Sequence, residues 1–205
     1  MVLNSRVDLA EKETLNAARQ AGWKTGKQQF SGTSSPGLDW ELNLSSEDSN
    51  NTLFWHTENA RLKGGVLVVL PRMVLQVFSG KSSKMAFSLT GRGRNWLKPG
   101  IKTLQLAIEK SQVVEAGSEG FQRRYCSYSN LPEAAVAILT PAVETLIMGF
   151  PVQPGQPFTP VYIVMNAGSL QVFAETTLQN MDAYTHMVNL GTALSACINT
   201  FQETA

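Results

Sequence analysis

The chain has 205 residues, a mass of 22.4 kDa, 43% hydrophobic residues and a formal net charge of +1 at pH 7. This hydrophobic content is normal for a globular protein and too high for an intrinsically disordered one, and the sequence lacks the run of about 18 apolar residues that predicts a membrane-spanning helix. The N-terminal segment lacks the apolar stretch that forms the core of a signal peptide, so we expect a soluble cytoplasmic protein.

The N-terminal part of the chain predicts a helix followed by a turn. Residues 9–21 carry an apolar stripe at helical spacing, with Asp8 as a candidate N-cap and Gly22 as the stop signal. Residues 32–37, Gly-Thr-Ser-Ser-Pro-Gly, have the composition of a turn.

Three strands are predicted next. Polar and apolar residues alternate over 39–44, which indicates a half-buried strand. A polar loop is expected over 45–51, followed by a second strand over 53–57. The continuous aliphatic run at 66–70 lies between a glycine and a proline, and its length and composition predict a buried strand.

The middle of the chain gives weaker signals. Residues 72–78 fit a short helix or a strand, and so do residues 104–114. Residues 80–100 are rich in Gly, Ser, Lys and Arg, so we expect an exposed loop or linker there.

The following segment predicts a strand and two helices. The strand is expected over 122–127, and the first helix begins after Asn130, which can serve as its N-cap. Thr140 and Pro141 predict the N-cap and the first residue of a second helix, which extends to Met148.

The C-terminal region predicts a hairpin and a long helix. Prolines exclude regular structure over 151–160. A hairpin is expected from 161–165 and 170–174, joined by a turn at 166–168. Apolar residues recur at helical spacing over 181–202, which predicts an amphipathic helix that packs against this hairpin.

Together these elements predict a single α+β domain over residues 1–205, in which antiparallel strands pack against helices on one side. The blocks 53–71 and 125–141 share the order of strand, polar bend, apolar run and proline. A duplication into similar halves, 1–95 and 105–205, would explain this, and chance similarity explains it nearly as well.

One segment carries a resemblance to known proteins. Residues 128–141, Tyr-Ser-Asn-Leu-Pro-Glu-Ala-Ala-Val-Ala-Ile-Leu-Thr-Pro, together with the hairpin and the final helix, resemble part of a bacterial family of uncharacterised proteins. In that family a Tyr-Ser…Glu-Ala…Ile-Leu-Thr-Pro stretch follows a strand, and relatives often carry membrane-spanning segments near the N-terminus, which are not expected in this chain. The resemblance covers about residues 121–200 and implies no catalytic residue.

Charged residues divide the chain into three parts. No Asp or Glu occurs from residue 59 to residue 108, whereas nine Lys or Arg residues do, so this basic stretch has a formal charge of +9. Residues 1–58 contain five basic and eight acidic residues (−3), and residues 109–205 contain three basic and eight acidic residues (−5). Such a region can attract anions, acidic partners or nucleic acid.

Within the basic stretch, one cluster combines cations with an aromatic ring. Arginine and an aromatic side chain can together grip a phosphate backbone and stack on a base. A solvated loop, or an intramolecular match for the acidic C-terminal part, is equally consistent with this pattern. The candidate polyanion-binding residues are Arg92, Arg94, Trp96, Lys98 and Lys102.

No motif in the sequence indicates catalysis or a bound metal. The two histidines, His56 and His186, and the two cysteines, Cys126 and Cys197, lie far apart and form no metal-binding spacing, so neither a metal nor a cofactor is expected. The sequence therefore favours a non-enzymatic binding or scaffolding module that forms a homo-oligomer or binds another protein. The alternative is an electrostatic binder of nucleic acid or another polyanion through residues 59–108, and an enzyme ranks third.

Overall fold

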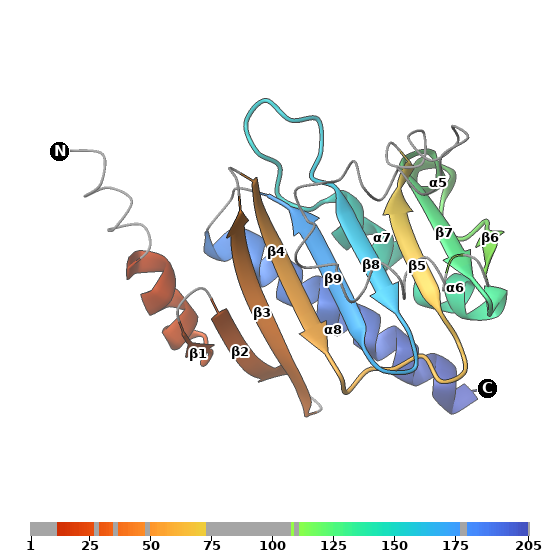
Figure 1. The fold of residues 1–205 in the computed structure, drawn as a ribbon, viewed down its shortest axis with the longest axis horizontal. Coiled ribbons are helices and arrows are strands. Elements are labelled where there is room, and N and C mark those ends of the chain that lie inside the picture. Colours follow the sequence, from red (N-terminus) through yellow and green to blue (C-terminus); the bar gives the residue numbers. More distant parts are fainter. Residues whose placement is uncertain are drawn as a thin grey trace.

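The computed structural model describes residues 12–26, 29–34, 37–47, 50–72, 108, 111–176 and 180–204. These residues form a nine-stranded sheet in which every pairing is antiparallel, with helices packed on one face (Figure 1). This arrangement confirms the predicted α+β class.

The strand order in the sheet is β1-β2-β3-β4-β9-β8-β5-β7-β6. A helix over residues 12–20 precedes the first strand. The strands are β1 (Lys24–Thr25), β2 (Gln29–Ser34), β3 (Leu38–Glu47), β4 (Asn50–Thr57), β5 (Leu67–Pro71), β6 (Gln112–Val114), β7 (Tyr125–Ser129), β8 (Val161–Met165) and β9 (Leu170–Glu175). The labelled helices are α5 (Glu119–Arg124), α6 (Pro132–Ile138), α7 (Pro141–Met148) and α8 (Met181–Thr204).

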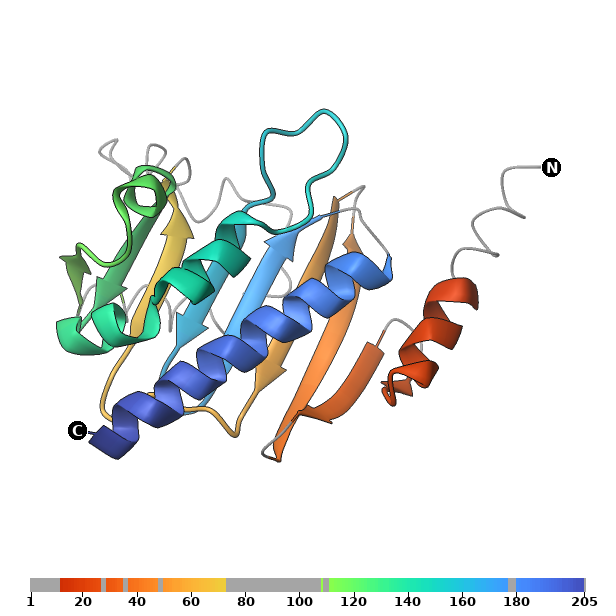
Figure 2. The ribbon, with the colours of Figure 1, turned by 180° about the vertical axis from the view of Figure 1, so that it is seen from behind.

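The main core lies between the sheet and helices α6, α7 and α8. Figure 2 shows α8 crossing the strands obliquely, with α6 and α7 beside it. The apolar stripe of α8 faces this core, and Leu194 is fully buried. Gly191 lets α8 approach β4 closely, because a Cβ atom at this position would lie 2.5 Å from the indole ring of Trp55.

The face of the sheet opposite α8, which we call the open face, carries a second, smaller apolar cluster. Val68 and Leu70 of β5 are buried there and pack against Ile108, Tyr128 and Val164. All five residues of β5 are therefore buried, which is why this strand appears in the sequence as a continuous hydrophobic run.

Several predicted elements are confirmed. They include the described part of the helix predicted over 9–21, which ends before Gly22, whose φ is 79°, the strands over 39–44, 53–57 and 66–70, the helix from Pro141, the irregular segment 151–160, the hairpin and the terminal helix. The predicted N-cap Asp8 and residues 9–11 lie outside the described residues. The side chain of Thr140 accepts a hydrogen bond from the backbone N–H of Val143, as expected of an N-cap.

The predicted turn at 32–37 is wrong in its first half, because β2 continues to Ser34. Gly32 pairs with Trp40 across the strands and lies beneath its indole ring, where a Cβ atom would come within 2.6 Å of Cζ2. The glycine is therefore needed for close packing within a strand and does not mark a turn.

The predicted polar loop at 45–51 is also wrong. β3 continues to Glu47 and β4 begins at Asn50, with Ser45 paired to Thr52 and Ser46 to Asn51. Backbone pairing between adjacent strands thus extends the hairpin through a segment whose side chains are almost all polar.

The strand predicted over 122–127 begins three residues later, because residues 119–124 form α5. Ser118 caps this helix by accepting a hydrogen bond from the N–H of Phe121. The buried carboxylate of Glu144 holds the cap in place, since it accepts hydrogen bonds from the N–H and the hydroxyl of Ser118 at 2.9 and 2.6 Å.

Asn130 is not the N-cap of α6. The cap position is Leu131, which makes no side-chain capping bond. The Asn130 side chain instead accepts a hydrogen bond from the N–H of Val66 at 2.7 Å and so joins two distant segments of the chain.

The remaining predictions concern segments that the structure describes in part or not at all. Within 104–114, the structure describes a strand at Gln112–Val114. Residues 73–107 lie outside the described residues, and they contain the segment predicted as a linker. The proposed duplication of halves 1–95 and 105–205 therefore stays a prediction.

Candidate binding groove on the open face

The basic cluster singled out in the sequence, Arg92, Arg94, Trp96, Lys98 and Lys102, lies outside the described residues.

Three basic residues of the 59–108 stretch are described, and all are exposed. The Nε atom of Arg61 donates to the carbonyl oxygen of Glu58, and that of Arg72 donates to the carbonyl oxygen of Gln122. Lys63 is the third. These contacts show two arginines bonded to backbone carbonyls.

A groove with a volume of about 700 Å³ lies along β1–β4. Three carboxylates line it, Asp39, Glu41 and Glu58, together with Lys24 and His56. With the histidine neutral, one positive and three negative charges give the described residues of the lining a formal charge of −2. We call this feature the acidic groove.

Strand register places these side chains on the open face. Trp40 and Leu42 of β3 face the core, so the alternating residue Glu41 points to the opposite side. Glu41 is the register partner of Ser31 on β2 and of His56 on β4. Because cross-strand partners share a face of the sheet, Ser31, Glu41 and His56 form one row of side chains across the groove.

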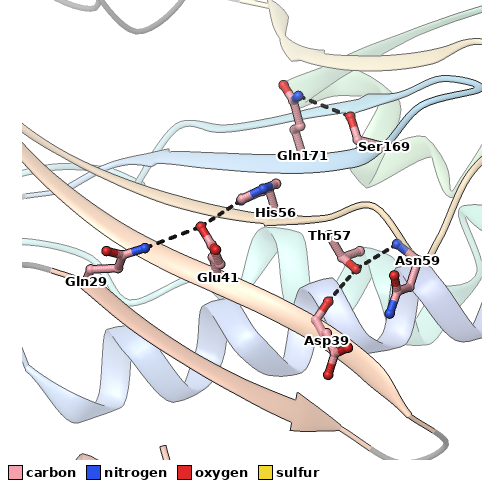
Figure 3. A network of polar contacts seen from close by, with 8 residues as sticks. All are labelled: Gln29, Asp39, Glu41, His56, Thr57, Asn59, Ser169 and Gln171. Atoms are coloured by element: carbon pink, nitrogen blue, oxygen red, sulfur yellow. Dashed lines mark hydrogen bonds and ion pairs between the residues drawn. The ribbon is translucent and has the colours of Figure 1, made fainter. Parts of the chain in front are cut away.

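A polar network orients the groove side chains (Figure 3). The Nε2 atom of Gln29 donates to Oε2 of Glu41 at 3.4 Å, and this same oxygen lies 4.0 Å from Nδ1 of His56. The hydroxyl of Thr33 donates to Oδ1 of Asp39 at 2.7 Å. Nδ1 of His56 is buried and makes no hydrogen bond within the described part of the chain, although a quarter of the side chain is exposed, 26%.

The end of β4 is fixed by backbone contacts in the same network. The hydroxyl of Thr57 donates to the carbonyl oxygen of Asp39 and accepts from the N–H of Asn59 at 3.1 Å (Figure 3). This pair of bonds holds the chain segment that carries Glu58 beside the groove.

The groove carboxylates have few cationic neighbours. Among the described residues, the ion pairs within 4.0 Å are His56 with Glu41 and Arg123 with Glu119. Neither Asp39 nor Glu58 takes part in either of them. Their charges are thus free to attract a cationic group from outside this part of the chain.

An aromatic row continues from the groove across the open face. The Phe54 ring stacks on His56 with centroids 5.4 Å apart and an interplanar angle of 8°, and it lies 4.8 Å from the Phe173 ring. Tyr162 is the register partner of Phe173, and its hydroxyl donates to Oε1 of Glu175 at 2.8 Å. Burial, followed by the negative charge of Glu175, raises the pKa of Tyr162 well above its ordinary value.

Within the described ranges, no three His, Cys, Asp or Glu side chains gather closely enough to hold a metal ion. None of the described helices combines the length and apolar character required to cross a membrane.

Sequence reasoning missed the acidic groove, although part of its signal is in the sequence. Asp39 and Glu41 alternate with the core residues Trp40 and Leu42, which marks them as outward-facing. The approach of Glu41 to His56 depends on the β3–β4 register, which hydrophobic periodicity alone does not give.

Comparisons of the chain with family models, with curated proteins and with solved structures found no match. The resemblance over residues 121–200 therefore stays a prediction, and the function has to be argued from the geometry of the open face.

Proposed function

We propose that this chain is a binding module that takes up a basic segment of a protein partner in the acidic groove. The observation that carries the proposal is the pair of carboxylates, Asp39 and Glu58, that line an open groove without a Lys or Arg partner among the described residues. Charged groups without a partner of opposite charge among the described residues favour a ligand of opposite charge.

The lining of the groove favours a peptide segment over a small metabolite. Small-molecule sites are mostly enclosed and apolar, with a few polar groups. Here the lining is largely polar and charged, and it includes the small side chains of Ser31 and Thr33 on β2. An extended chain bearing Arg or Lys fits such a surface.

The neighbouring rings suit arginine in particular. A guanidinium group forms two parallel hydrogen bonds with a carboxylate and stacks on aromatic faces. Glu41 and the stacked pair of His56 and Phe54 present both kinds of contact side by side.

The test is fluorescence anisotropy with a labelled peptide of alternating Arg and Ser, compared with an acidic peptide of equal length. Each exposed ion pair contributes roughly 0.2–1 kcal/mol, so the double variant D39N/E58Q should weaken binding by about 2- to 30-fold. Glu119 pairs with Arg123 on exposed α5, so E119Q is a matched control that should bind like the unmodified chain.

Added salt should weaken binding of the Arg-Ser peptide, because the contacts are exposed. Equal affinity for the basic and acidic peptides, or equal affinity of D39N/E58Q and E119Q, would contradict the proposal.

We propose separately, as the sequence analysis favours, that the chain forms a homo-oligomer. Light scattering should then give a mass above 22.4 kDa that depends on concentration. A constant mass of one chain would refute this part alone and leave the groove proposal standing.

Polyanion binding through residues 59–108 is the second candidate function. It is favoured by the absence of Asp and Glu throughout that stretch. Its test is the salt dependence of oligonucleotide binding, which is described below.

A further inference from the structure

The acidic groove contains one residue of the type that changes charge near neutral pH. Histidine ordinarily gains a proton as the pH falls from about 8 to about 5. His56 on β4 is the histidine among the described lining residues. The other histidine of the chain, His186, lies on α8, where its Nε2 atom is 2.6 Å from the carbonyl oxygen of Leu146. Proton uptake by a histidine therefore alters the groove at His56.

The Nδ1 atom of His56 is buried beside a carboxylate. It makes no hydrogen bond within the described part of the chain, and Oε2 of Glu41 lies 4.0 Å away (Figure 3). This separation exceeds the roughly 2.7–3.2 Å of an N–H···O hydrogen bond. Because a buried N–H without an acceptor is unfavourable, a proton on Nδ1 favours closure of this gap. The Glu41 side chain is 48% exposed and its bond from Gln29 is long, at 3.4 Å, so it is able to move toward the ring.

Carboxylates, and neither Lys nor Arg, lie beside His56 on β3 and after β4. Glu41 is the register partner of His56, and Asp39 lies two residues before Glu41 on the same face of the sheet. The third acidic residue of β3, Glu47, lies at the far end of the strand. Glu58 follows His56 by two residues and also lines the groove. Among the described residues, a protonated His56 therefore has Glu41 as the carboxylate within 4.0 Å.

The other described elements packed against β4 bring no positive charge to this position. On β9, the register partner of His56 is the neutral Gln171, and the charged residue of this strand, Glu175, is its last residue. Helix α8 packs against the opposite face of the sheet (Figure 2). Lys24, the lysine of the groove lining, lies on β1, which β2 and β3 separate from β4. A proton on His56 thus adds a positive charge where the groove is otherwise acidic.

We propose that His56 is the pH-sensitive element of the acidic groove: when protonated it pairs with Glu41 and weakens binding of the basic partner segment, and when neutral it leaves this carboxylate to the partner. The inference rests on the proposed function of the groove. With His56 protonated, two positive and three negative charges give the described lining −1 in place of −2. The cation of the partner then meets a less negative groove and a Glu41 that is already paired.

The ring of Phe54 supports the same switch. It stacks on His56 with centroids 5.4 Å apart and an interplanar angle of 8°. A cation within about 6 Å of an aromatic ring centroid is attracted by that ring, so a protonated imidazole gains this contact. The stacked pair is then positively charged, and it repels the guanidinium that the neutral pair would accept.

The experiment is fluorescence anisotropy with the labelled Arg-Ser peptide at about pH 7.5 and about pH 5.5, at constant ionic strength. Arginine keeps its charge at both values, so a pH dependence reports on the protein. Binding to the unmodified chain should be about 2- to 5-fold weaker at the lower pH, the effect of losing one exposed ion pair. His56→Gln stays neutral, so it should bind the peptide equally at both values. It keeps every carboxylate of the groove, so any effect of carboxylate protonation remains in this variant.

His186→Gln is the matched control. It removes the other histidine of the chain, which lies on the helix side of the sheet, and should retain the full pH dependence. Glu41→Gln keeps His56 but removes the carboxylate beside it, so its pH dependence should be smaller than that of the unmodified chain. This variant keeps the inference testable should His56→Gln unfold. Circular dichroism melts at both pH values establish which variants are folded.

The outcomes separate this inference from the proposed function. An unmodified chain that does not bind the peptide at the higher pH overturns both. Binding that is equally tight at the two pH values overturns the switch alone and leaves the groove proposal standing. The same holds when folded His56→Gln or folded Glu41→Gln keeps the full pH dependence, or when His186→Gln loses it.

Discussion

Gly191→Ala tests the close contact between α8 and β4. Alanine is favoured over glycine inside a helix by about 1 kcal/mol, so helix propensity alone predicts stabilisation. The added Cβ would lie 2.5 Å from the indole of Trp55, whose side chain is fully buried. Overpacking of a core costs up to about 3 kcal/mol, so we expect a net loss of about 2 kcal/mol in the free energy of unfolding.

The matched control is Gly120→Ala in the exposed helix α5. Among the described residues, a Cβ atom there would have only the hydroxyl of Ser118 within 4 Å, at 3.9 Å, so this variant should gain about 0.5–1 kcal/mol. Urea unfolding followed by tryptophan fluorescence measures both changes. A Gly191→Ala variant as stable as the unmodified chain would show that α8 does not approach Trp55 as described.

Three further predictions concern the core, the open face and the basic stretch. Leu194→Ala should lower the free energy of unfolding by about 2–5 kcal/mol in denaturant melts, because it truncates a fully buried leucine; a loss below about 0.5 kcal/mol would contradict this. Burial, followed by the neighbouring Cys126, raises the pKa of Tyr128 from 10.0 to about 12, so stability should fall as the pH rises through this window, and Tyr128→Phe should reduce that fall. If the basic stretch binds polyanions, anisotropy of labelled oligonucleotides should fall steeply with salt, and replacing Arg92, Arg94 and Lys98 by alanine should flatten the slope; no binding at tens of micromolar would refute it.

Local rules predicted the elements whose signals are local. The helix from Pro141 follows from its own cap and proline, and α8 follows from apolar spacing within one segment. The hairpin of β8 and β9 likewise follows from two short apolar runs and the turn between them. In each case the residues that determine the element lie inside it or next to it.

The errors arose where distant residues decide the structure. β7 begins later than predicted because Glu144, which is 26 residues from Ser118 in the sequence, holds the N-cap of α5 in place. Gly32 belongs to a strand because Trp40 of the neighbouring strand covers it. Asn130 bonds to Val66 instead of capping a helix, across 64 residues. A single sequence contains these residues but does not indicate their pairing.

The candidate site was harder to predict than the fold for the same reason. The sequence emphasises the basic stretch, because like charges that are close in the chain are easy to see. The acidic groove combines Glu41, His56 and Glu58 only after β3 and β4 have paired. The clustering of these charged side chains therefore depends on the register between β3 and β4.

The opposite charges of the basic stretch and the acidic groove allow a decisive comparison. If the basic stretch serves as an intramolecular match for acidic groups that include this groove, it competes with any basic peptide. Replacing Arg92, Arg94 and Lys98 by alanine should then strengthen binding of the Arg-Ser peptide, because the competing cations are lost. If the groove serves an outside partner only, the same variant should bind the peptide unchanged while losing its affinity for oligonucleotides. Measuring both ligands on one variant thus separates an internal charge match from two independent binding surfaces.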